Sequence, residues 1–488
     1  FAEKLLIEAC QELIHFEEVI GLQDCGAAGL TSSLSEMAAR GNSGLEIELS
    51  SVPQRETNMN PFEIMLSESQ ERMVVVVEKG KEERVLKTLA RWDLNSAIIG
   101  QVTSDGNFTI KNQGKMVAHI PVSAIVDGAP LIERPVQKPK WMKKVNQLNM
   151  ESIQLFTEYN EILLRLLGSP NLSCKEEIYQ QYDHMVQTNT VLPPGDDAAV
   201  LRIKGSKKGL ALTTEGNGRY CFLDPYRGAQ LAVAEAARNL SCKGALPRAV
   251  TDCLNFGVPE NSDSYWQLVQ GIKGLAQACQ FFNTPVISGN VSLYNENDGI
   301  SIDPTPVVGM VGVIEDCKQT CTLSFKNKGD LIFMIGEAKN ELGGSEYLEV
   351  VHHLKTGIPP ELNEELEKKL QAFCRFAIKK KLLSSAHDCS LGGIAIALAE
   401  SCIAGQLGAD IQCKADIRSD CWLFGESQSR IIMSIHPSVL DQFLNILKEW
   451  QIPFQQLGIV MGDHLRINNW IDQPVQLLEK TWRRKVDA

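Results

Sequence analysis

The segment Ile287–Asn295, which reads as a polar turn between a strand and a loop, holds the residues best suited to bind a phosphorylated ligand. Gly289 would let the backbone approach a phosphate closely, because glycine has no side chain in the way. Asn290 offers an amide oxygen to a cation, and Ser292 offers a hydroxyl to a substrate. A polar strand-to-loop turn without a ligand would have the same composition, so both interpretations stay open.

Two further turns carry carboxylates. Asp252 lies in Thr251–Gly257 after an apolar run, at an expected strand end, where ligand sites in α/β sheets are common. Pro194–Val200 places Asp196 and Asp197 between a turn and a strand. Their oxygens could meet Mg²⁺, which typically takes one or two carboxylates and completes its shell with water and phosphate oxygens. Aspartates that only cap a strand or a turn explain both patterns equally well.

An internal repeat adds a further candidate. The segment Gln23–Glu36 recurs without a gap as His387–Glu400. Asp24 of the first copy matches Asp388 of the second. Repeats of this length indicate a duplicated structural unit rather than chance similarity.

A second block follows in each copy. Ser67–Arg72 contains Glu68, Ser69 and Gln70, and it matches Gly425–Arg430, which also contains Glu-Ser-Gln. Both blocks continue into an apolar run typical of a strand. Retention in both copies can reflect shared folding needs as easily as shared chemistry, so ligand contacts and a structural loop remain alternatives.

These motifs divide the chain. Each copy alternates helices and strands, which indicates an α/β domain, and the region between the copies has its own strands and two long helices, which indicates α+β. A stretch rich in proline and polar residues links the first copy to the middle region. We expect a first α/β domain over 1–122, a linker over 123–150, an α+β domain over 151–316 and a second α/β domain over 317–488. The chain opens without Met inside an amphipathic helix, so we expect the first domain to be truncated and a longer polypeptide to precede it.

Composition excludes several classes of protein. The chain has 48 basic and 60 acidic residues, a formal charge of −12, and no basic block, which argues against a nucleic-acid partner. No apolar run approaches the roughly 20 residues of a membrane helix. The 14 cysteines include no Cys-x-x-Cys, so we expect free thiols in a reducing, cytoplasmic compartment. Neither a Walker A motif nor a Gly-x-Gly-x-x-Gly loop is present.

Several long motifs together resemble one family. They are Arg248–Gly257, Gly289–Glu296, Pro304–Gly309, Gly195–Val200 and the two Glu-Ser-Gln blocks. In their order along the chain they resemble phosphoribosylformylglycinamidine synthase in its small-subunit form, and the resemblance covers essentially the whole chain. Gly195–Val200 alone would fit the wider aminoimidazole ribonucleotide (AIR) synthetase-like superfamily. The resemblance implies duplicated A-B units, here a partial B1 (α/β), a ferredoxin-like A2 (α+β) and a complete B2 (α/β).

The resemblance also implies an activity. Members of the family convert formylglycinamide ribonucleotide to formylglycinamidine ribonucleotide in purine biosynthesis, with ATP, Mg²⁺ and glutamine-derived ammonia. Carried over by motif, the expected roles are Mg²⁺ ligands for Asp24 and Asn290, ATP contacts for Asp252 and Gly289, and substrate contacts for Glu68, Ser69, Gln70 and Ser292. The second-copy residues Asp388, Glu426–Gln428 and Gly343–Ser345 would form a pseudo-equivalent pocket, which holds a structural nucleotide in some family members.

The family's catalytic histidine lies upstream of the matched region, so we expect no catalytic residue in this segment and no synthase activity from it alone. Ammonia is expected from a separate glutaminase subunit, with a small third subunit in the complex. One alternative is a nucleotide-binding, catalytically silent scaffold of the same superfamily. A superfamily enzyme with a single A-B unit is another, but the repeated order found here counts against it.

Overall fold

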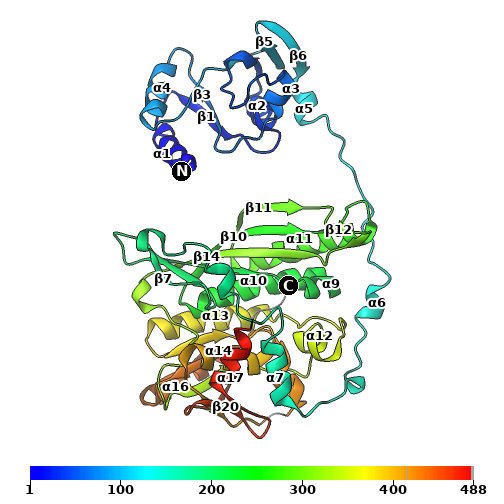
Figure 1. Cartoon of the computed structure of the whole chain (residues 1–488), viewed down its shortest axis with the longest axis vertical. Coiled ribbons are helices and arrows are strands. Elements are labelled where there is room, and N and C mark those ends of the chain that lie inside the picture. The colour runs from blue at the N-terminus through cyan, green and yellow to red at the C-terminus, as the bar shows by residue number, and fades with distance from the viewer. Residues whose placement is uncertain (415, 485–488) are drawn as a thin grey trace. The chain divides into compact units, whose positions relative to one another are not determined.

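The computed structural model describes residues 1–414 and 416–484, and the chain divides into two compact units, Phe1–Glu133 and Arg134–Ala488 (Figure 1). Each unit is described by itself. In the described residues no helix has the length and apolar character needed to cross a membrane. The fourteen cysteines are all free thiols, as the sequence predicts.

Unit 1 is an α/β domain with one antiparallel sheet of two strands and one mixed sheet of four strands. Its elements are α1 (Ala2–Leu13), β1 (Val19–Asp24), α2 (Gly29–Arg40), β2 (Gly44–Glu48), α3 (Pro61–Leu66), β3 (Met73–Val77), α4 (Glu82–Arg91), β4 (Gly100–Thr103), β5 (Asn107–Asn112), β6 (Lys115–Pro121) and α5 (Val122–Val126). β1 pairs with β3, and the second sheet has the order β4-β2-β5-β6. Apolar residues at every fourth position of α2, Leu30, Leu34 and Ala38, face this domain's core.

The middle of the chain forms a six-stranded sheet with helices on one face. Its main elements are β7 (Thr190–Leu192), β8 (Ala199–Arg202), β9 (Gly209–Glu215), α9 (Gly218–Leu223), α10 (Pro225–Cys242), β10 (Leu246–Asn255), α11 (Ser262–Phe282), β11 (Val286–Ser292) and β14 (Thr305–Ile314). The strand order is β11-β10-β14-β9-β8-β7. Every second residue of β14 is buried, because that face packs against α10 and α11 while the opposite face is more open (Figure 1).

The last third of the chain forms a seven-stranded sheet covered on both faces. Its elements are β15 (Leu331–Ile335), α12 (Glu346–His352), α13 (Glu364–Lys379), β16 (Ser385–Asp388), α14 (Gly393–Gly405), β17 (Ala409–Ile411), α15 (Ser419–Phe424), β18 (Ile431–Ile435), α16 (Leu440–Trp450), β19 (Phe454–Val460), β20 (His464–Ile467), β21 (Ile471–Pro474) and α17 (Val475–Trp482). α13 and α16 pack on one face, and α14, α17 and α7 (Tyr159–Leu167) pack on the other. All five residues of β18 are buried as a result.

Topology confirms the repeat predicted from the sequence. In unit 1 the sheets β1-β3 and β4-β2-β5-β6 are separate, whereas the second copy has the single order β16-β18-β15-β19-β17-β20-β21. β16-β18 corresponds to β1-β3, and β19-β17-β20-β21 corresponds to β4-β2-β5-β6, with the same parallel and antiparallel pairings. β15 joins the two parts, and no strand of the described residues in unit 1 plays that role.

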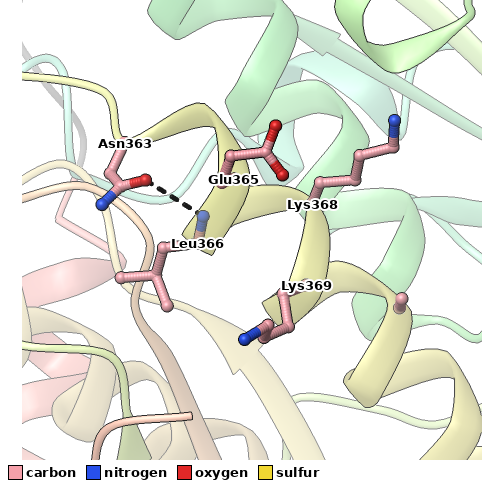
Figure 2. A pocket seen from close by; sticks show the side chains of 6 residues that line it. Asn363, Glu365, Leu366, Lys368 and Lys369 are labelled. Carbon is pink, nitrogen blue, oxygen red and sulfur yellow. Dashed lines mark hydrogen bonds between the residues drawn. The ribbon is translucent and has the colours of Figure 1, made fainter. Parts of the chain in front are cut away.

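A shallow hollow lies at the start of α13, and Figure 2 shows its lining. The Asn363 side chain accepts a hydrogen bond from the Leu366 backbone N–H at 3.1 Å, which caps the helix. Glu365, Lys368 and Lys369 project in different directions rather than toward a common point. Because its polar groups do not converge, this hollow is a helix end and not a candidate site.

Candidate functional site

The predicted residues of unit 1 come together where α2 begins. Asp24 ends β1, and its side chain is exposed. The Ala28 backbone N–H, at the start of α2, donates to Glu68 Oε1 at 2.9 Å. Gly29 has φ +54°, and a Cβ there would overlap the carbonyl oxygen of Ser67, so this close approach requires glycine. The loop that carries Glu68 is therefore packed directly against the helix start that follows Asp24.

Arg72 fixes the shape of that loop. Its Nε donates to the Ser69 carbonyl at 3.0 Å, and its guanidinium also donates to the Ser67 carbonyl. The Arg72 carbonyl in turn accepts the Cys25 backbone N–H at 3.0 Å. Glu68 and Gln70 remain exposed and Ser69 is half-buried, so the loop is held by backbone contacts while its side chains stay available.

The second copy repeats these hydrogen bonds. Arg430 Nε and Nη2 donate to the carbonyls of Ser427 and Gly425, both at 2.7 Å. Glu426 Oε1 accepts the Gly392 backbone N–H at 2.8 Å, as Glu68 accepts that of Ala28. The Glu-Ser-Gln-x-Arg block is thus first of all a loop-forming motif, which explains its retention in both copies without requiring ligand binding in both.

The Glu-Ser-Gln loop of the second copy has different neighbours from the loop of the first copy. Tyr220 donates its hydroxyl to Glu426, and Arg238 binds Asp388 through Nε and donates through Nη2 to Gln428 Oε1 at 3.2 Å. These side chains are buried. In the second copy, protein side chains from α9 and α10 therefore satisfy the groups whose first-copy counterparts are exposed. The other expected part of the pseudo-equivalent pocket, Gly343–Ser345, is tied to the same region because the Gly344 carbonyl accepts from Arg219 Nε at 2.6 Å.

In unit 2 the predicted residues lie on the neighbouring strands β10 and β11. The parallel register pairs Asp252 with Gly289, Cys253 with Asn290, and Asn255 with Ser292. Paired residues share a face and successive residues alternate, so the Asp252–Gly289 pair lies on the face covered by helices and Asn290 on the opposite face. β11 is an edge strand and is exposed along most of its length.

Gly289 has a structural reason to be glycine. A Cβ at this position would overlap Oδ1 of Asp252. Burial raises the pKa of the Asp252 carboxyl above its usual value. The missing side chain at Gly289 therefore also makes room for the Asp252 carboxylate inside the protein, and its role beside a phosphate stays a prediction.

The acidic turn Asp196–Asp197 has protein partners. Lys243 Nζ forms ion pairs with both carboxylates, at 3.2 Å to Asp197 Oδ2. The Leu323 backbone N–H donates to Asp196 Oδ2 at 3.1 Å. This turn therefore joins α10 to the last third of the chain, rather than presenting two free carboxylates to a metal ion.

A cavity of about 1380 Å³ lies beside these groups, lined by residues of both the six-stranded sheet and the second α/β domain. Burial raises the pKa of Glu215 well above its usual value. Burial and the charge of Asp388 together raise the pKa of Glu235 to about 7. Asp388 lines this cavity, whereas Glu426–Gln428 and Gly343–Ser345, the other residues expected in a pseudo-equivalent pocket, do not. In the described residues no group of three or more His, Cys, Asp or Glu side chains is arranged for a metal ion.

His387 shows how a single difference between the copies changes electrostatics. Its Nδ1 lies 2.6 Å from Asp197 Oδ1 and its Nε2 lies 3.0 Å from Glu400 Oε2. The first copy has Gln23 at this position, with Nε2 3.3 Å from Glu36 Oε2. Burial opposes the charged ring, but the two carboxylates outweigh it and raise the pKa of His387 well above its usual value.

A pH dependence of stability follows. Because the folded pKa of His387 is raised, its charge stabilises the fold fully below the unfolded pKa of about 6.5 and less as pH rises through the folded pKa. The control is His387→Gln, which has the residue of the first copy. As pH rises, the free energy of unfolding of the parent should fall relative to that of His387→Gln, by up to about 1.4 kcal/mol for each unit by which folding raises the pKa of His387. Urea unfolding between about pH 6 and pH 9 measures this difference. Parallel pH profiles for the two proteins would contradict it.

Sequence reasoning missed three buried cations, one on α9, one on α10 and one directly after α10. Arg219, Arg238 and Lys243 are buried and each pairs with carboxylates. A signal was present, because charged residues interrupt an otherwise apolar helix, and a helix that is apolar all round is usually buried. Their partners lie more than a hundred residues away in most cases, so only the structure identifies them.

Comparisons with known proteins define the class first. The family described as AIR synthase related protein, C-terminal domain, matches residues 1–112 and 327–468, and the corresponding N-terminal domain family matches residues 195–314. The chain therefore consists of AIR synthase-like domains, with one C-terminal-type domain before and one after an N-terminal-type domain in the sequence.

The relatives narrow this class. The phosphoribosylformylglycinamidine synthase subunit PurL of Caldanaerobacter subterraneus subsp. tengcongensis is 51% identical over 490 residues, covering 100% of this chain and 67% of that protein. Thermotoga maritima PurL complexed with ADP matches with a TM-score of 0.66 and 28% identity, over 94% of this chain and 67% of that one. The same protein complexed with FGAR gives 0.65 and 28%, over 95% and 65%. The chain belongs to the family of PurL subunits of phosphoribosylformylglycinamidine synthase, enzymes of purine biosynthesis.

Proposed function

We propose that this chain supplies substrate-, ATP- and metal-binding groups for the ATP-dependent ligation that converts formylglycinamide ribonucleotide to formylglycinamidine ribonucleotide. The observation that carries this proposal is the 51% identity to a PurL subunit over the whole chain. Thermotoga maritima PurL, which this chain resembles, has been solved with ATP and with FGAR. A catalytically silent scaffold is not favoured, because the curated relatives are synthase subunits.

The reaction requires a site that neutralises the charge of the phosphoryl group and aligns the two ligands. ATP phosphorylates the amide oxygen of the substrate, and ammonia then displaces the phosphate. Two anionic ligands must be held in line while charge moves between them, which favours a cation and fixed hydrogen-bond donors over a protein nucleophile. Bound Mg²⁺ would neutralise the negative charge of the phosphates.

Asp24 and Asn290 suit the metal role by the chemistry of their oxygens. Mg²⁺ prefers carboxylate and carbonyl oxygens and needs only one or two carboxylates from the protein. Both side chains are exposed, and no cation within the described range of the chain forms an ion pair with Asp24. Asp24 therefore differs from its counterpart Asp388, whose charge is already balanced by Arg238.

The other predicted residues would contact either the substrate or ATP. Glu68, Ser69 and Gln70 would contact the substrate from a loop that Arg72 holds in shape. Ser292 would add a hydroxyl, and Asp252 with Gly289 would contact ATP. Glu68 already accepts a backbone N–H at the helix start, so its second oxygen remains free to accept from a substrate hydroxyl or amide.

Partners complete the proposal. The structure named PurLQS from Thermotoga maritima supports an assembly of PurL with further subunits. We propose that a separate glutaminase subunit delivers ammonia in the cytoplasm and that a small third subunit joins the complex. The chain spans about two thirds of the length of its curated relatives. That the chain has no activity by itself remains a proposal, which measurable turnover by the isolated 488 residues would contradict.

The metal assignments are tested in the full-length protein with ammonia as nitrogen donor. Asp24→Ala and Asn290→Ala are each expected to lower turnover by about 100-fold or more, since a metal contributes several kcal/mol of charge stabilisation. Raising the Mg²⁺ concentration should recover part of the loss. Asp127→Ala, which removes another exposed carboxylate of unit 1, should match the parent. Unchanged rates and unchanged Mg²⁺ dependence for both site variants would show that the ligands are elsewhere.

A further inference from the structure

The segment that joins the two units is fastened to unit 2 by specific contacts. Residues 134–146, here called the linker strap, contain one short helix, α6 (Met142–Val145). Pro139 and Met142 are buried. The Val145 carbonyl accepts the Gly357 backbone N–H at 2.9 Å. The strap therefore has a defined course, although the sequence reads as a proline-rich linker.

Trp141 is the main anchor of the linker strap. Its ring stacks on Phe222 with centroids 4.7 Å apart and planes 19° apart, and its Nε1 donates to Asp263 Oδ2 at 2.8 Å. Lys355 Nζ lies 3.9 Å from the centroid of the Phe222 ring and 2.6 Å from Asp303 Oδ1. Trp141 thus reaches Asp303 through two intermediate side chains.

Arg134 forms a second anchor. Its Nη2 lies 2.6 Å from Glu260 Oε1, and the Tyr294 hydroxyl donates to the same oxygen at 3.1 Å. Tyr294 has φ +61°, a backbone conformation that an aromatic residue adopts only when its surroundings hold it there. The contact with Glu260 is one of the interactions that hold it.

Both anchors reach the loop that follows β11. This loop begins directly after Ser292, the last residue of β11, runs to Asp303 and contains the small hairpin of β12 (Glu296–Asn297) and β13 (Ile300–Ser301). Asn295 Nδ2 donates to the Ser292 carbonyl at 2.9 Å. Tyr294 lies near the start of the loop and shares Glu260 with Arg134, and Asp303 lies at its end and is linked to Trp141 through Lys355 and Phe222.

We propose that Arg134 and Trp141 are positioning residues that set the conformation of the loop that begins directly after Ser292. This inference rests on the proposed function, in which Ser292 contacts the substrate. Neither residue touches the strand positions Asp252 or Asn290 in the structure, so they act through Glu260, Tyr294 and Asp303. Loosening either anchor lowers the fraction of protein whose loop is competent to bind, and apparent affinity falls in proportion to that fraction.

The test uses ammonia-dependent kinetics of the full-length protein. Arg134→Gln and Tyr294→Phe are each expected to raise the KM for formylglycinamide ribonucleotide by about 3- to 10-fold, the size of a lost hydrogen bond or ion pair. We expect kcat and the KM for ATP to stay within about 2-fold, since a shifted loop population acts on substrate binding. Arg134→Lys should restore much of the affinity, and Trp141→Phe, which keeps the stack but loses the donor, should show a smaller rise.

Two further variants separate the possible outcomes. The double variant Arg134→Gln/Tyr294→Phe should be no worse than the more affected single variant, because both residues act through Glu260. Lys208→Gln, which removes a surface ion pair with Glu315 elsewhere in unit 2, should leave the KM unchanged. Additive effects, or folded strap variants with the parent KM, would overturn the inference.

The Ser292 assignment is tested separately by Ser292→Ala. If this variant raises the KM for the ribonucleotide and the strap variants do not, the inference is wrong while the proposed function stands. If the strap variants raise the KM and Ser292→Ala does not, the linker strap positions the loop and a group of that loop contacts the substrate.

Discussion

Gly289→Ala is expected to lower turnover of the full-length synthase by about 100-fold or more, a barrier increase of about 3 kcal/mol. The added Cβ would overlap Oδ1 of Asp252, which lies directly opposite in the parallel pair. The carboxylate would have to turn away, and the two strands would also have to shift, because the Cβ would lie 2.7 Å from the Asp252 carbonyl oxygen. The KM for ATP should rise with the loss of turnover, since Asp252 is the proposed ATP contact.

Steady-state kinetics with varied ATP measure this effect, and circular dichroism confirms the fold. β11 is an exposed edge strand, so the substitution should change overall stability little. Val286→Ala on the same strand is the matched control, because Val286 is exposed and lies away from Asp252 in the register. A Gly289→Ala protein with the parent KM for ATP and the parent turnover would show that the Asp252 carboxylate does not bind the nucleotide.

The organisation of the chain could be predicted largely from the repeat. The match of Gln23–Glu36 with His387–Glu400 predicted two related α/β domains, and both copies have the same strand pairings. The apolar run predicted after each Glu-Ser-Gln block is a strand, β3 (Met73–Val77) in the first copy and β18 (Ile431–Ile435) in the second. The helices and strands and their order could be predicted because periodicity and turn residues are local properties of a sequence.

Contacts between residues far apart in the sequence could not be predicted from it. The overlap between Gly289 and Asp252 depends on strand register, which no motif states. The partners of Arg238 come from α13, β16 and the second Glu-Ser-Gln block. Local patterns indicate that a charged residue lies on a buried helix, but only the assembled fold shows which carboxylates balance it.

The two copies show one loop design used in two ways. In both, an arginine shapes the Glu-Ser-Gln loop and the glutamate accepts a backbone N–H at a helix start. In the first copy the aspartate and glutamate are exposed, which suits a ligand. In the second copy, Arg238 and Tyr220 bind the equivalent groups, so the same framework serves to join two domains.

Arg238→Met should therefore destabilise the protein strongly, by about 3–5 kcal/mol, as expected when one partner of a buried ion pair is removed. Arg238 and Glu367 are fully buried, with Nη1 2.8 Å from Glu367 Oε2, and Arg238 also binds Asp388. Methionine fills similar volume but leaves both carboxylates buried without a cation. Urea unfolding of unit 2 measures the change.

Two comparisons make this result specific to charge. Arg466→Met removes an exposed ion pair with Asp472, and its cost should be only about 0–1 kcal/mol, because solvent screens such pairs. Adding Asp388→Asn and Glu367→Gln to Arg238→Met should recover part of the lost stability, since the uncompensated charges are then gone. A single Arg238→Met variant that costs less than about 1 kcal/mol would mean that the carboxylates find protons or water instead, and that Arg238 is not what joins the second copy to α10.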